Sequence, residues 1–168
     1  LELSSLNIKV LPSDINISDV GFTVEKHEDQ LSIRSGLATI KNIGLDLAKF
    51  IVSDRLKNGL YDSIINFFTR MDDKVINKRQ VEFLAMAGVF DSIFKDRSTI
   101  FTSATKLVAI SQNSQRDRDT CQQGLFGSEL NVNNTSNILK NSISWNTSKN
   151  LINEYLSLGF FISENPLI

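Results

Sequence analysis

Four consecutive residues, Lys41 to Gly44, have the types and spacing that can hold a phosphate group. They lie within GLATIKNIGLDLAKFIVSDR, whose pattern predicts a short helix, a tight turn at IKNIG and a second helix that begins just after Gly44. Such a turn presents backbone N–H groups at a helix start, where the helix dipole adds positive potential for an anion. Lys41 adds a full positive charge beside them. The same pattern also fits a simple turn, punctuated by glycine, between two core helices.

The turn follows the helix-hairpin-helix pattern, which reads hydrophobic-x-Gly-hydrophobic-Gly, with one departure. Asn42 stands where the pattern has its inner glycine. Asparagine is the residue other than glycine that best tolerates a left-handed backbone, so we expect the turn to form with a looser approach of phosphate. A second segment, VINKRQVEFLAMAGVFDSI, lacks a glycine turn at its start. Lys78 and Arg79 at the beginning of its helix could contact a phosphate, or could be a solvated first turn.

A third candidate site is the peptide CQQGLFGS at residues 121–128, which places two large apolar side chains in a polar run. Gln122, Leu125 and Phe126 could lay one amide and two apolar anchors into a pocket on another protein. Anchors of this kind concentrate binding energy in a few side chains. Alternatively, Leu125 and Phe126 pack beneath their own loop as a satellite of the core.

Hydrophobic periodicity predicts the elements that position these residues. GFTVEK and QLSIRSG alternate apolar and polar residues and predict a β-hairpin, preceded by an extended segment around Pro12. Helices are expected from Leu45 to Gly59, over 60–71, from Asn77 to Gly88, from near Ser98 to Gln112, and over 148–157. Asn77 and Gln80 are expected to form a capping box at the start of the third helix. Residues 113–147 are expected to form a loop. The apolar positions expected to face the core are Leu45, Ala48, Ile51 and Val52; Ile64, Ile65, Phe67 and Phe68; Val81, Leu84 and Ala85; Phe101, Ala104, Leu107 and Val108; and Leu151, Ile152, Tyr155 and Leu156.

Composition narrows the classes of function. A net charge of −1 means that any phosphate contact is local and not driven by a basic field. One cysteine suits a reducing cytoplasm, and no apolar run reaches the roughly 18 residues of a membrane span. The start at Leu1 without methionine indicates an excised piece of a longer protein.

The sequence predicts no catalytic, metal or cofactor site in this segment. Its adjacent acidic pairs, Glu28–Asp29 and Asp72–Asp73, lie beside turns in charged surroundings and are expected to be solvated. His27 is the one histidine and forms no ligand set with Cys121.

Motifs along nearly the whole chain resemble the alpha subunit of bacterial DNA polymerase III, in the region between the fingers and the oligonucleotide-binding domain. The motifs are, in order, VLPSDIN, FTVE, IRSGLATIKNIG, NKRQVEFLAMAGVFDSI, QRDRDTCQQGLFG and LGFFISENPL. The resemblance implies tandem helix-hairpin-helix elements that hold duplex DNA, followed by a peptide that docks on the sliding clamp, the beta subunit. It assigns Lys41, Asn42, Ile43 and Gly44 to the DNA-contacting hairpin, Lys78 and Arg79 to the second element, and Gln122, Leu125 and Phe126 to the clamp.

The predicted fold is therefore mainly α: a tandem helix-hairpin-helix with a small N-terminal β-hairpin and a flexible clamp-binding loop. We expect an extended segment and hairpin at 1–35, the DNA-binding module at 36–95, a helix with the clamp-binding loop at 96–147, and a C-terminal helix at 148–168 leading to a further domain.

The resemblance further implies a cytoplasmic nucleotidyltransferase as the parent polypeptide, a DNA-directed DNA polymerase. Its Mg²⁺ would be bound elsewhere, and its other replicase subunits would contact the full-length chain. Two alternatives stay open: a separate helix-hairpin-helix adaptor of DNA repair, and a helical protein-interaction module that does not bind DNA.

Overall fold

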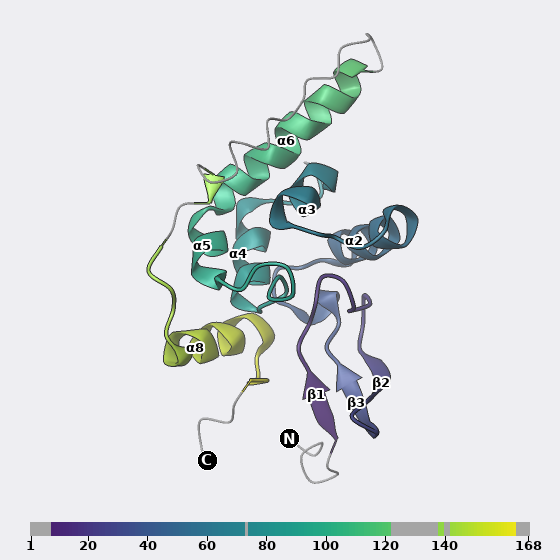
Figure 1. The fold of residues 1–168 in the computed structure, drawn as a ribbon, viewed down its shortest axis with the longest axis vertical. Helices are drawn as coiled ribbons and strands as arrows, with labels where there is room; N and C mark the ends of the chain where they lie inside the picture. Colours follow the sequence, from purple (N-terminus) through teal and green to yellow (C-terminus); the bar gives the residue numbers. More distant parts are fainter. Residues whose placement is uncertain (1–7, 73, 122–137, 140–141, 164–168) are drawn as a thin grey trace.

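The computed structural model describes residues 8–72, 74–121, 138–139 and 142–163 and is mainly helical. Figure 1 shows a small sheet and helix α8 at one end, helices α2 to α5 in the middle, and α6 extending away to the other end. The strands are β1 (Lys9–Leu11), β2 (Thr23–His27) and β3 (Gln30–Arg34). The helices are the 3₁₀ turn η1 (Leu37–Thr39), α2 (Leu45–Asn58), α3 (Ile64–Arg70), α4 (Lys78–Met86), α5 (Arg97–Thr102), α6 (Ala104–Cys121) and α8 (Thr147–Leu158).

The sheet confirms the predicted β-hairpin and adds one strand. Strands β2 and β3 pair antiparallel, and the two residues between them, Glu28 and Asp29, both have positive φ angles, of 51° and 64°. Such angles give a tight turn whose twist matches the strands. Strand β1 lies in the segment that the sequence predicted only as extended, and it pairs in parallel with β3. Its three residues are too few to show an alternating pattern.

Helices α2 and α3 differ from the prediction in their buried faces and boundaries. On α2 the buried residues are Leu47, Ala48 and Ile51, whereas Leu45 is 59% exposed and Val52 is half-buried. Helix α3 begins at Ile64 and not at residue 60, because the Ser63 side chain accepts a hydrogen bond from the Asn66 amide at 3.1 Å and caps the helix there.

Helix α4 begins with the predicted capping box. The Asn77 side chain accepts from the Gln80 amide at 3.1 Å, and the Gln80 side chain accepts from the Asn77 amide at 2.8 Å. Helices α4 and α5 pack against each other across the turn at 87–96, where Gly88 has a φ of 73°.

Because the Asn77 cap satisfies a first-turn amide of α4, replacing it should weaken the fold measurably. The Asn77→Ala variant is expected to lower the free energy of unfolding by about 1 kcal/mol, measured by urea denaturation. Asn77→Ser, which keeps a capping oxygen, is the control and should retain most of the stability. Equal losses in both variants would contradict the capping role.

The predicted helix from Ser98 to Gln112 is instead two helices, of which the second is longer than expected. The N-cap of α5 is Asp96, two positions before Ser98, and its carboxylate accepts from the Ser98 amide at 3.1 Å. The chain leaves α5 at Ser103, and α6 continues to Cys121 through residues predicted to be loop. This last part of α6 is mostly exposed, so it carries no apolar period.

Helix α8 has the predicted position but not the predicted buried face. Ile152, Tyr155 and Leu156 are about half exposed, at 52%, 50% and 48%. Its buried residues are Asn153, Glu154, Ser157 and Leu158. Three of these four residues are polar, and Glu154 is buried because it forms an ion pair with Arg97 of α5.

The core draws buried residues from each of the helices α2 to α6 and contains a cluster of aromatic rings. Phe67 is fully buried, with its ring centroid 5.0 Å from that of Tyr61, 5.0 Å from that of Phe68 and 5.2 Å from that of Phe90, each edge to face. This geometry is favourable for aromatic pairs. In the part of the chain that the structure describes, no helix has the length and apolar character needed to cross a membrane.

Candidate nucleic-acid interface

The turn between η1 and α2 has a buried side and an exposed side. Ile40 and Ile43 are 2% and 5% exposed, and they anchor the turn in the hydrophobic core. Lys41, Asn42 and Gly44 are exposed. Asn42 has a φ of 64°, so the prediction of a left-handed backbone at this position is confirmed. The turn therefore presents Lys41, Asn42 and Gly44 to solvent and holds Ile43 inside.

The start of α2 has no side-chain cap. Gly44 is the N-cap residue, and no side chain there hydrogen-bonds to the helix. The first-turn amides of a helix have no intrahelical acceptor. The space beside Gly44 is open, since a Cβ placed there would meet no atom within 4 Å. The positive end of the helix dipole thus lies beside open space at Gly44, although the exposed carboxylate of Asp46 in the same turn adds a negative charge.

Lys78 and Arg79 lie at the start of α4, at the opposite end of that helix from the α4–α5 turn. Lys78 is exposed, and its ammonium lies 3.7 Å from Glu82 one turn along the helix. The Arg79 guanidinium lies over the Phe83 ring, 5.9 Å from its centroid. The capping box already occupies the backbone amides of Asn77 and Gln80. A ligand at this helix start would therefore meet mainly the side-chain charges of Lys78 and Arg79.

A depression of about 410 Å³ joins the starts of α2 and α4. It is lined by Gly44, Asp46, Leu47, Lys74, Val75, Ile76, Asn77 and Gln80. The structure therefore brings the predicted hairpin beside the beginning of α4, but Lys41, Lys78 and Arg79 do not line the depression itself.

Lys74 is a candidate site residue that the sequence reasoning missed. It is exposed, it lines the depression, and its backbone amide donates to the Asp72 carboxylate at 2.9 Å. The available signal was the run DDKVINKR, in which Lys74 precedes Lys78 and Arg79 by four and five positions.

The turn at residues 41–44 is also hydrogen-bonded to α8, which lies much later in the sequence. The backbone N–H of Lys41 donates to the carbonyl of Ser157, in the last turn of α8, at 2.8 Å. One amide of the turn is therefore occupied, and the Lys41 side chain is left exposed.

The residues predicted to bind the clamp, Gln122, Leu125 and Phe126, lie outside the described residues. They follow α6, which ends at Cys121.

Three of the four residues in the two adjacent acidic pairs, Glu28–Asp29 and Asp72–Asp73, lie in the described part of the chain. Glu28 and Asp29 are exposed in the hairpin turn, and Asp72 caps a turn, while Asp73 lies outside the described part. Among the described residues there is no cluster of three or more histidine, cysteine or acidic side chains that could hold a metal ion.

Comparison with known proteins identifies relatives along nearly the entire chain. Residues 7–100 match a family described as helix-hairpin-helix motif. The DNA polymerase III subunit alpha of Caulobacter vibrioides is 36% identical over 160 residues, which cover 95% of this chain and 14% of that protein. The corresponding subunit of Aquifex aeolicus is 36% identical over 159 residues, covering 95% and 12%. That of Borreliella burgdorferi is 33% identical over 172 residues, covering 99% and 14%.

The chain thus spans about one seventh of the length of these relatives. The family match covers more than half of it and includes the turn and both helix starts described above. The chain therefore belongs to the helix-hairpin-helix family and is homologous to one segment of bacterial DNA polymerase III alpha subunits.

Proposed function

We propose that this chain is the DNA- and sliding-clamp-binding part of a replicative DNA polymerase. It holds duplex DNA through the sugar–phosphate backbone and docks on the clamp through the QQGLF peptide. The parent polypeptide carries out nucleotidyl transfer in the cytoplasm with its other replicase subunits, and this segment contributes no catalytic residue. The two metal ions that such transfer requires would be bound elsewhere in the parent.

The observation that carries the DNA contact is the uncapped, exposed start of α2 beside Lys41. Backbone amides and one lysine recognise phosphate without reading bases. A polymerase that moves over every sequence needs contacts of this kind. With a net charge of −1 the chain has no general attraction for DNA, so the contact is confined to this surface.

The clamp contact is supported by the sequence that follows α6. Figure 1 shows α6 extending away from the sheet, and the chain enters QQGLF directly after Cys121 at its far end. The peptide itself lies outside the described residues, so its support is the pairing of Gln122 with two large apolar side chains, Leu125 and Phe126, in a polar run. Tethering to the clamp then raises the effective concentration of the DNA-binding surface, so that neither contact needs to be tight.

The relatives bear on the alternative of a separate DNA-repair adaptor. Their similarity covers 95% to 99% of this chain, well beyond the helix-hairpin-helix match at 7–100, and each of those proteins is a polymerase subunit. This extent favours the polymerase assignment.

Reversing the charge of Lys41 tests the DNA contact and the alternative of a module that does not bind DNA. Lys41→Glu is expected to weaken binding to a short duplex by about 5- to 10-fold and to reduce the slope of log K against log salt by about one. Fluorescence anisotropy across a salt series measures both.

Lys57→Glu is the matched control, because Lys57 is an exposed lysine in the last turn of α2, far from Gly44. It should bind duplex nearly as the unmodified chain does. If Lys41→Glu also binds with unchanged affinity and salt slope, the proposed DNA contact at this turn is wrong.

A further inference from the structure

We propose that Glu154 is a positioning residue for the DNA-contacting turn, acting through helix α8. Its buried carboxylate fixes α8 against the α4–α5 hairpin, and the end of α8 in turn holds the backbone of Lys41. The inference rests on the proposed DNA contact, and it assigns a role in that contact to a side chain outside the predicted DNA-contacting surface.

The link between the turn and α8 is the hydrogen bond from the Lys41 amide to the Ser157 carbonyl, at 2.8 Å. Carbonyls in the last turn of a helix have no intrahelical donor, so this one is available to the turn. Ser157 is fully buried, whereas the Lys41 side chain is exposed. Helix α8 therefore fixes the backbone of Lys41 and leaves its ammonium free to meet a ligand.

The link between α8 and the rest of the domain is made by Glu154, whose side chain is 3% exposed. One carboxylate oxygen accepts from Arg97 Nη1 at 3.1 Å and from the Ser163 hydroxyl. The other accepts from the Ser163 amide at 3.3 Å. Glu154 and Ser157 lie three positions apart, on one buried face of α8. The carboxylate is thus one helical turn from the carbonyl that Lys41 uses.

Arg97 is itself held firmly, so the ion pair connects α8 to a rigid support. Its guanidinium also contacts Asp91, with Nη2 2.6 Å from Oδ2. Burial alone would lower the pKa of Arg97, but the hydrogen bonds and charges of Asp91 and Glu154 outweigh it and raise that pKa. The space that the guanidinium occupies exists because residue 88 is glycine: a Cβ there would lie 2.4 Å from Arg97 Nη2.

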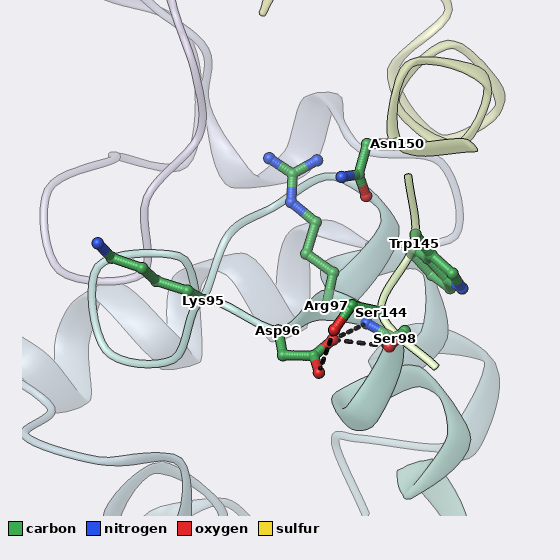
Figure 2. Close-up of a pocket in the computed structure, with 7 residues that line it drawn as sticks. All are labelled: Lys95, Asp96, Arg97, Ser98, Ser144, Trp145 and Asn150. Atoms are coloured by element: carbon green, nitrogen blue, oxygen red, sulfur yellow. Dashed lines mark hydrogen bonds between the residues drawn. The ribbon is translucent and has the colours of Figure 1, made fainter. Parts of the chain in front are cut away.

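A second group of hydrogen bonds, centred on Asp96, holds the segment that leads into α8, as Figure 2 shows. The Asp96 carboxylate accepts from the hydroxyls of Ser98 at 2.6 Å and Ser144 at 3.0 Å. Burial raises the pKa of Asp96, but hydrogen bonds from Ser98, Ser144 and Thr99 outweigh it, so the pKa lies below its ordinary value. The hydrogen bonds of Asp96 hold the segment just before α8. Glu154 instead holds the C-terminal half of α8, whose Ser157 carbonyl accepts from Lys41.

Removing the charge of Glu154 should loosen the end of α8 without removing a phosphate contact. Glu154→Gln removes one of the two carboxylates that pair with Arg97 and leaves Asp91, so the Ser157 carbonyl is held less firmly against Lys41. The fraction of molecules with the turn correctly placed falls, and the apparent affinity for DNA falls by the same factor. The salt slope should stay unchanged, because every cation of the surface is still present.

The test compares Glu154→Gln with Asp54→Asn in the whole chain. Asp54 forms a similarly buried ion pair, 2.6 Å from Arg70, but near the opposite end of α2 from Gly44. Circular dichroism sets a temperature at which both variants are folded. We expect Glu154→Gln to bind a short duplex about 5- to 10-fold more weakly with an unchanged salt slope, and its Lys41 amide to exchange hydrogen at least about 10-fold faster. Asp54→Asn should change neither quantity more than about twofold.

The outcomes separate this inference from the proposed function. Equal duplex affinity in Glu154→Gln and Asp54→Asn, or unchanged exchange at Lys41, overturns the positioning role of Glu154. Unchanged duplex binding in Lys41→Glu overturns the proposed DNA contact itself. If Glu154→Gln does not fold, Ser163→Ala removes one donor to the same carboxylate from an exposed position. It should then weaken duplex binding about twofold and accelerate Lys41 exchange, and no change in either quantity would overturn the role.

Discussion

Replacing Leu125 and Phe126 together by alanine is expected to reduce association with the cognate sliding clamp by at least about 100-fold. Both residues have large apolar side chains in a polar stretch, and the proposal makes them the anchors of the clamp contact. Truncating an anchor at the centre of an interface commonly costs 2 kcal/mol or more, and about 1.4 kcal/mol is tenfold in affinity. Surface plasmon resonance or isothermal titration calorimetry with the purified clamp measures the loss.

Stability measurements on the same double variant separate the clamp proposal from the alternative that the two side chains pack in the chain's own core. If they serve the clamp, the midpoint of thermal unfolding should stay within about 1 °C, because surface substitutions usually change stability little. Ile143→Ala is the control for loss of an exposed apolar side chain, since Ile143 is 94% exposed. Full clamp affinity in the double variant, or a large fall in its unfolding midpoint, would contradict the proposal.

The Phe67→Ala variant is expected to lower the free energy of unfolding by about 3–5 kcal/mol. Phe67 is fully buried and meets three aromatic rings, those of Tyr61, Phe68 and Phe90. Truncation leaves a cavity among these rings and removes their edge-to-face contacts. Since total stability is typically about 5–15 kcal/mol, a large part of it would be lost.

Urea denaturation followed by circular dichroism measures this change. Leu56→Ala is the matched control, because Leu56 is a large apolar residue on α2 that is 79% exposed. Its loss should change the free energy of unfolding by about 0.5 kcal/mol or less. A similar effect of the two substitutions would show that the aromatic cluster does not dominate the core.

Several features of the fold and site could be predicted from sequence because their causes are local. The left-handed backbone at Asn42, the helix start after Gly44 and the capping box of Asn77 with Gln80 each involve residues within about one helical turn. The β2–β3 hairpin likewise depends on a short alternating pattern around a tight turn.

The features that sequence reasoning missed depend on partners distant along the chain. The inward face of α8 was predicted from its apolar residues, yet Glu154 is buried there because Arg97, 57 positions away, pairs with it. An amphipathic pattern assumes that apolar residues face the core, and it cannot show a buried ion pair. Lys74 became a candidate only when the starts of α2 and α4 were seen to share one depression.

By itself the sequence determined that the chain is mainly helical, where the turn before α2 forms, and to which family the chain is related. The tertiary structure alone decided that β1 joins the sheet, that α6 continues through a polar stretch, and that the last turn of α8 holds Lys41 in place. The reason is physical: backbone conformation and capping arise from neighbouring residues, whereas strand pairing and buried hydrogen bonds require segments that only folding brings together.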